Sequence, residues 1–199
     1  MARKKAANLY HKMNRSRPAS SGLDKRFATS HEAPPLVRSS EGVLLHTNFG
    51  WRYHFEVDPK NPIVQMCAKG MEFEGRGCLD EASQVFLNAW NESADDFERC
   101  IAAHYVARHQ KNSVDTLLWN QRSLDLANVV GDERVREFYP SLYLNMGKAH
   151  EDLGNREESR RFYEMAVTAL DSLPEGRYGD IVREAVGRAL LRSRDCVTG

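Results

Sequence analysis

Two histidines that can carry protons, His104 and His109, lie close together in this sequence, with the cationic Arg108 between them. They fall on one predicted helix, and His150 follows in a similar pattern. Because imidazole is the usual proton carrier near neutral pH, acid–base chemistry is one interpretation. No nucleophile and carboxylate can be assembled with them into a catalytic set. His104 and His150 also fall on the packing sides of their helices, where a hydrogen-bonded core histidine is the commoner explanation.

Motifs for catalysis or metal binding are missing from the sequence. The chain has no glycine-rich loop after a strand, no P-loop, no nucleophile elbow and no HExxH. Its cysteines, Cys67, Cys78, Cys100 and Cys196, form no CxxC and no paired Cys/His spacing. They lie in apolar helical patterns, which is typical of small core residues in a reducing compartment. We therefore expect no enzyme activity, no cofactor and no metal site.

An internal repeat organises the rest of the chain. Residues 66–89, MCAKGMEFEGRGCLDEASQVFLNA, return 77 residues later as YLNMGKAHEDLGNREESRRFYEMA, residues 143–166. Self-similarity at a fixed offset is the signature of a repeat architecture. The residues that recur in register are Gly70 with Gly147, Phe73 with His150, Gly77 with Gly154, Ala82 with Ser159, Phe86 with Tyr163 and Ala89 with Ala166.

With this order of glycine, aromatic and small residues, the two segments resemble the tetratricopeptide repeat (TPR). The resemblance covers about residues 63–195. It implies an all-α fold, an antiparallel helix-hairpin solenoid of three TPR-like repeats plus a C-terminal capping helix. It also implies a module or scaffold that binds an extended peptide or a partner helix in its concave groove. Because such repeats serve many partners, the identity of the partner stays open.

The repeat domain is expected to span residues 59–199. Asn61 is a good N-cap and Pro62 fits the first helical position. Gly77 should turn the chain between the first two helices, and Ala82 should pack against Gly70. The second hairpin is expected over residues 97–110 and about 113–130, and it is degenerate, with His104 where glycine is usual.

The start of the third repeat has two interpretations. Gly131 and Asp132 predict a helix stop followed by a new N-cap. We prefer a lengthened first helix from Glu133 that carries Val135 and Phe138 inward and is kinked at Pro140. The alternative is a break with a fresh start at that proline. After the third repeat, residues 178–195 should form the capping helix, with its arginines facing water.

The resemblance also names a set of residues that would line the groove. Family members line it with the first helices of successive repeats. The resulting polar, mostly basic strip suits a peptide with carboxylates. Its candidate peptide-binding residues are Tyr105, Arg108, His109, Asn145, Lys148 and Arg188. The alternative is that these side chains solvate the surface and pair with Glu151 and Glu184. The family's carboxylate clamp is rejected, because Cys67 and Met71 stand where it needs a lysine and an asparagine.

Residues 1–58 form a basic extension that we expect to be largely disordered. Residues 1–60 hold 11 Lys and Arg against 5 Asp and Glu, so a neutral total hides a basic arm on an acidic body. A solvated tail is the preferred interpretation, and an organelle transit peptide is less favoured. The alternative function is a nucleic-acid-associated adaptor that uses Arg3, Lys4, Lys5, Trp51 and Arg52, within an aromatic segment at residues 43–57. That segment could instead dock on the first repeat.

No run of about 18 apolar residues is present, so the sequence predicts no membrane span. The basic N-terminus lacks the apolar stretch of a secretory signal. Together with the cysteine pattern, these features predict a cytoplasmic location. The expected partner is another protein or peptide, with nucleic acid less favoured and no membrane.

Overall fold

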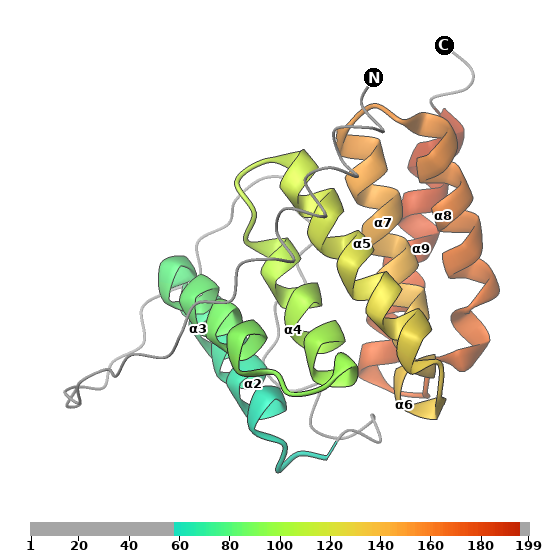
Figure 1. The fold of residues 1–199 in the computed structure, drawn as a ribbon. Helices are drawn as coiled ribbons and strands as arrows, with labels where there is room; N and C mark the ends of the chain where they lie inside the picture. The colour runs from blue at the N-terminus through green and yellow to red at the C-terminus, as the bar shows by residue number, and fades with distance from the viewer. Residues whose placement is uncertain (1–57, 196–199) are drawn as a thin grey trace. The chain divides into compact units, whose positions relative to one another are not determined.

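The computed structural model describes residues 58–195, with side chains to residue 193, and all of them belong to the unit Pro35–Gly199. Every regular element in this range is a helix, which confirms the predicted all-α class for the part that is described (Figure 1). The elements are α2 Pro62–Gly75, α3 Leu79–Glu92, α4 Asp96–Arg108, α5 Ser113–Val130, α6 Glu133–Arg136, α7 Tyr139–Asp152, α8 Arg156–Thr168, the short 3-10 helix η1 Leu170–Ser172 and α9 Arg177–Asp195.

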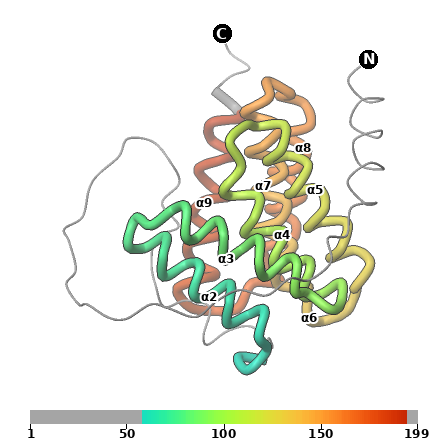
Figure 2. The backbone as a smooth tube through the Cα atoms, turned by 60° about the vertical axis from the view of Figure 1, so that its left-hand side comes forward, coloured from blue at the N-terminus to red at the C-terminus, as the bar shows by residue number. Residues whose placement is uncertain are grey.

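Helices that follow one another in the sequence pack next to one another. Short connections join α2 to α3, α4 to α5 and α7 to α8, and the two helices of each pair pack against each other in opposite directions (Figure 1). Each pair packs on the next through α3 with α4 and α5 with α7, and α9 closes the row against α8. Two further contacts, of α2 with α4 and of α7 with α9, join helices that do not follow one another directly (Figure 2).

The start of α2 is fixed by the predicted cap. Oδ1 of Asn61 accepts hydrogen bonds from the backbone N–H of Ile63 at 2.9 Å and of Val64 at 3.1 Å, and Pro62 occupies the first turn. These bonds satisfy donors that the helix itself cannot pair. Nδ2 of Asn61 also donates to Oε1 of Glu98 at 2.7 Å, which ties the beginning of α2 to α4.

Two turns of the chain have the same conformation 77 residues apart. Gly77 has φ +76° after α2, and Gly154 has φ +73° after α7. The next residues close the turns identically, since Cys78 N–H donates to Phe73 O and Asn155 N–H donates to His150 O, both at 2.9 Å. A positive φ favours glycine, so the sequence correctly predicted the turn at Gly77.

The contact between the helices of these pairs also recurs. A Cβ on Gly70 would meet the ring of Phe86, and a Cβ on Gly147 would meet the ring of Tyr163. The predicted contact of Ala82 with Gly70 stays a prediction, and Ala82 is fully buried. The glycines therefore make room for an aromatic ring of the next helix.

Helix α4 is the most enclosed element among the described residues. It contacts α2, α3 and α5, so side chains around its whole circumference are buried. The inward positions predicted from one face, Cys100, Ala103 and Ala107, are buried as expected. Further buried residues are Phe97, Ile101, Ala102, Tyr105 and Val106.

The third pair begins with a break, so the preferred sequence prediction of one lengthened helix is wrong. Helix α6 ends at Arg136, and α7 starts at Tyr139 with Pro140 in its first turn. Proline lacks an N–H and is tolerated there, whereas inside a helix it would remove a hydrogen bond. Val135 and Phe138 are buried, as predicted.

Helix α9 covers the end of the row. Val182, Ala185, Val186 and Ala189 are buried, as the apolar pattern predicted. Arg183, which was expected to face water, bends back, and its NH2 group donates to Leu173 O at 2.9 Å. Its aliphatic stem and guanidinium thus fasten the start of α9 to the segment after α8.

Candidate functional site

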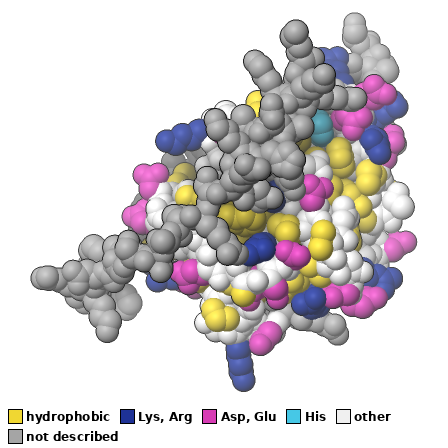
Figure 3. Space-filling view, viewed as in Figure 1, with side chains coloured by type: hydrophobic (Ala, Val, Ile, Leu, Met, Phe, Trp, Pro, Cys, Tyr) yellow, Lys and Arg dark blue, Asp and Glu magenta, His cyan; other side chains and the backbone are white. Residues whose placement is uncertain are grey.

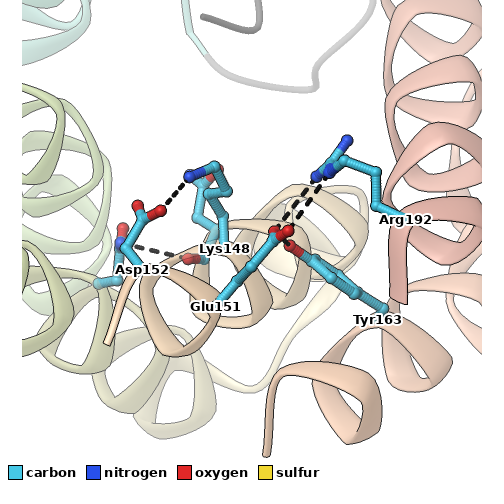
Figure 4. Close-up of polar contacts among 7 residues, drawn as sticks. Lys148, Glu151, Asp152, Tyr163 and Arg192 are labelled. Carbon is cyan, nitrogen blue, oxygen red and sulfur yellow. Dashed lines mark hydrogen bonds and ion pairs between the residues drawn. The ribbon is translucent and has the colours of Figure 1, made fainter. Parts of the chain in front are cut away.

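The candidate site is a charged strip on α7 and α9, which we call the α7–α9 strip and define by Lys148, Glu151 and Asp152 of α7 and Glu184, Arg188 and Arg192 of α9. Spacings of three and four residues put the members of each helix on one side. Lys148 and Glu151 project from α7 toward the same side, and Arg192 reaches Glu151 from α9 (Figure 4). The strip is therefore built by two helices that pack together.

Glu151 is the centre of this strip. Its carboxylate accepts hydrogen bonds from the Tyr163 hydroxyl at 2.5 Å and from Nε and NH2 of Arg192, each at 3.3 Å (Figure 4). Burial alone would raise the pKa of this carboxyl. The hydrogen bonds from Arg192 and Tyr163, with the nearby charge of Lys148, outweigh it and hold the pKa below its usual value. Glu151 therefore joins α7, α8 and α9 as a carboxylate.

Lys148 and Arg188 are the cations of the α7–α9 strip that pair within their own helices. Each is 47% exposed and pairs four residues along its own helix, Lys148 with Asp152 and Arg188 with Glu184. Exposed pairs of this kind contribute only about 0.3–0.5 kcal/mol. Either cation can thus leave its partner for the carboxylate of a ligand at small cost.

Arg108 and His109, two predicted site residues, are held by one buried acid. Oε1 of Glu74 lies 2.7 Å from Nε2 of His109, and its Oε2 lies 3.0 Å from NH2 of Arg108. The side chain of Glu74 is only 9% exposed, so these contacts satisfy a carboxylate that has lost most of its water. The two residues connect α4 to α2, and Arg108 keeps 27% of its side chain exposed.

Tyr105 was predicted as an apolar anchor for a peptide, but the structure places it in the core. It is 1% exposed, and its ring stacks on Phe86 at 4.8 Å. Its hydroxyl donates to Sδ of Met71 at 3.3 Å. Tyr105 thus packs against α2 and α3 from α4, and its role as a peptide anchor stays a prediction.

Asn145 and His104 meet between α7 and α4. Nδ2 of Asn145 lies 3.4 Å from Nδ1 of His104, and Asn120 donates to the backbone oxygen of Asn145 at 3.5 Å. Burial, with the nearby charge of Arg108, lowers the pKa of His104 to about 3. This imidazole is neutral near pH 7 and serves as a polar group in the packing, as its sequence position predicted.

His150 has a comparable environment on α7. Its ring stacks on Phe162 at 5.4 Å with an interplanar angle of 11°. Burial lowers its pKa below the usual value, against the opposing influence of Glu158. Both histidines that the sequence placed on packing sides are thus packed against neighbouring side chains.

Arg192 belongs to the site, although the sequence predicted only that it faces solvent. Arg192 was expected to face water, whereas it binds Glu151 across the gap between α9 and α7. Its spacing of four residues from Arg188 was the available signal. The nucleic-acid candidates Arg3, Lys4, Lys5, Trp51 and Arg52 lie outside residues 58–195, and the domain boundary expected at residue 58 stays a prediction.

Two properties of the described residues concern metal binding and membranes. Within residues 58–195, His, Cys, Asp and Glu side chains form no group of three or more that could hold a metal ion. In the same range, none of the helices combines the length and the apolar character that crossing a bilayer requires. Comparisons of the chain with protein-family models, with curated proteins and with solved structures found no match.

Proposed function

We propose that residues 58–195 form a TPR-like solenoid that acts as a protein-interaction module. The repeated glycine–ring contacts support this architecture, since Gly70 faces Phe86 as Gly147 faces Tyr163. The matched turns at Gly77 and Gly154 support it independently. In this proposal the pair α4–α5 is the degenerate middle repeat and α9 is the cap that a stack of repeats requires.

The ligand that we propose for this module is an extended, acidic peptide segment bound along the α7–α9 strip. The observation that carries this proposal is that Lys148 and Arg188 are half-exposed and that, among residues 58–193, their ion pairs are with neighbours on their own helices. A peptide carboxylate can replace Asp152 or Glu184 with little loss. Arg192, already fixed by Glu151, offers a third cation whose position is set in advance.

The remaining predicted residues have structural roles in this proposal. Arg108 and His109 hold Glu74, and Tyr105 fills the core, so these three act as framework. Asn145 is half-buried, and its backbone oxygen and side chain are engaged by Asn120 and His104. The proposed binding residues are therefore Lys148, Arg188 and Arg192.

A peptide-display selection on the full chain tests this function. The wild type should enrich peptides rich in Asp and Glu, and Lys148→Ala with Arg188→Ala should lose that enrichment. The matched control is Arg160→Ala, which removes another exposed arginine from an i,i+4 pair, with Glu164 on α8. Selection without acidic enrichment, or equal enrichment by wild type and double variant, would contradict the proposal.

A further inference from the structure

A pocket of about 620 Å³ opens between α7 and α8, away from the α7–α9 strip. Its volume falls in the range of small-ligand and anchor-residue pockets. On the face drawn in Figure 3, exposed hydrophobic side chains gather over α5, α7 and α8 among charged side chains of both signs. The pocket is lined by Arg136, Tyr139, Tyr143, Arg161, Glu164, Met165, Thr168, Ala169, Asp171 and Ser172.

Two tyrosines form the aromatic wall of this pocket. The rings of Tyr139 and Tyr143 stack with centroids 5.6 Å apart, and the Tyr139 hydroxyl donates to Oδ1 of Asn128 at 3.1 Å. That bond holds the ring of Tyr139 in place. Elsewhere on the molecule arginines cover aromatic faces, as Arg134 covers Phe97 at 5.0 Å. No cation from residues 58–193 covers either tyrosine of the pocket.

The lining holds two arginines and two acids, and they differ in their ion-pair partners. Both arginines have an acid of their own, since Arg136 pairs with Glu133 at 3.1 Å and Arg161 pairs with Glu158 at 3.4 Å. Glu164 lies 3.5 Å from Arg160, whereas Asp171 has no ion-pair partner in the part of the chain that the structure describes. The pocket also lies at the C-terminal end of α8, where the helix dipole carries negative partial charge.

We propose that this pocket binds a cationic side chain, arginine or lysine, presented by a partner protein. The tyrosine rings attract a cation through their quadrupole, and the Asp171 carboxylate provides the charge partner. Met165 and Ala169 line the pocket where the aliphatic stem of such a side chain can lie. The occupant thus combines a positive head with an apolar stem.

The pocket is a second site and does not depend on the proposed function of the α7–α9 strip. Tyr143 and Lys148 are five residues apart on α7, which places them about 140° apart around the helix axis. The two sites also prefer opposite charges, since the strip offers exposed cations in weak pairs and the pocket offers Asp171, a carboxylate without an ion-pair partner among residues 58–193. A partner with both acidic and basic segments could engage both.

The test uses three blocked tripeptides as probes: acetyl-Gly-Arg-Gly-amide, its lysine counterpart and acetyl-Gly-Glu-Gly-amide. Each is titrated at millimolar concentration into the full ¹⁵N-labelled chain, and amide shifts are followed. We expect saturable shifts confined to residues near Tyr143 and Asp171 with the arginine and lysine probes. Shifts with the glutamate probe alone would overturn the proposal, because the arginines of the lining would then be the recognising groups. Equal shifts with all three probes would also overturn it, because the pocket would then not select for positive charge.

Two variants with a matched control assign the binding groups. Asp171→Asn should weaken the arginine probe about 2–5-fold, and Tyr143→Leu should weaken it by a similar factor through the lost ring face. Glu157→Gln removes an acid of α8 outside the lining and should leave the affinity unchanged. Tyr143 is half-buried, so Asp171→Asn is the decisive variant if Tyr143→Leu unfolds. Unchanged affinity in Asp171→Asn would overturn the assignment.

Discussion

The ring of Phe86 occupies the space that a side chain on Gly70 would need: a Cβ there would lie 2.6 Å from Cζ of the ring. Gly70→Ala should therefore destabilise the fold. The overpacking cost of about 1–3 kcal/mol opposes a gain in helix propensity of about 1 kcal/mol. Because both helices α2 and α3 are held by their packing, we expect the cost to exceed the gain in chemical denaturation.

The control for this prediction lies in α9. A Cβ on Gly187 would meet no atom within 4 Å, so Gly187→Ala should stabilise by about 0.5–1 kcal/mol through helix propensity alone. Gly147→Ala should behave like Gly70→Ala, since its Cβ would meet Tyr163. If all three variants gained stability equally, the close packing of glycine against ring would be refuted.

The ion pair between Arg108 and Glu74 should be structural. Arg108→Leu leaves the buried Glu74 carboxylate with His109 as its remaining partner, and we expect a loss of about 1–3 kcal/mol in urea denaturation. Adding Glu74→Gln removes the stranded charge and should recover part of that loss. An unchanged midpoint for Arg108→Leu would show that this arginine is free for a ligand after all.

Neutral His104 should make the fold sensitive to acid. Burial and Arg108 lower its pKa to about 3, below the ordinary value of about 6.5. As the pH falls from about 6.5 toward 3, His104 binds a proton in the unfolded chain but stays neutral in the folded chain. The free energy of unfolding then drops by up to about 1.4 kcal/mol per pH unit. His104→Gln, compared with wild type over this range, should show a shallower dependence, and identical slopes would contradict the lowered pKa.

The hydroxyl of Tyr163 should stabilise the ionised form of Glu151. Tyr163→Phe removes the 2.5 Å hydrogen bond and should cost about 1 kcal/mol near neutral pH, at the low end for charged partners because Glu151 reaches water. The pKa of Glu151 is lowered in the fold, so this stability is present above about pH 4.3 and is lost as the pH falls through the lowered value. The difference between variant and wild type should therefore shrink in acid; a constant difference would argue against the carboxylate as the acceptor.

Local signals in the sequence were sufficient for much of the helical layout. The cap at Asn61, the turn at Gly77 and the helices that became α3 and α5 each depend on residues near one another in the chain. The break before α7 was left between two alternatives, because Pro140 suits both a kinked helix and a first turn. Burial of Val135 and Phe138 is compatible both with one kinked helix and with a break before the proline.

Long-range contacts decided what the sequence could not. Glu74 pairs with residues 34 and 35 positions later, and Tyr105 is covered because α4 packs on three helices. Neither result follows from counting positions along one helix. By contrast, the pairs Lys148–Asp152 and Arg188–Glu184 have the i,i+4 spacing, and the alternative that the basic residues pair with nearby acids anticipated Glu184.

The most direct measurement of the proposed function is the affinity of one acidic peptide taken from the display selection. Isothermal titration with the full chain should show that Lys148→Ala with Arg188→Ala weakens binding at least about tenfold, since each lost charged hydrogen bond contributes about 1.5–3 kcal/mol when shielded from water. The double variant and the control Arg160→Ala should both keep the thermal stability of the wild type, and Arg160→Ala should also keep its affinity. Equal affinity for wild type and the double variant would contradict the account and remove the α7–α9 strip as the binding surface.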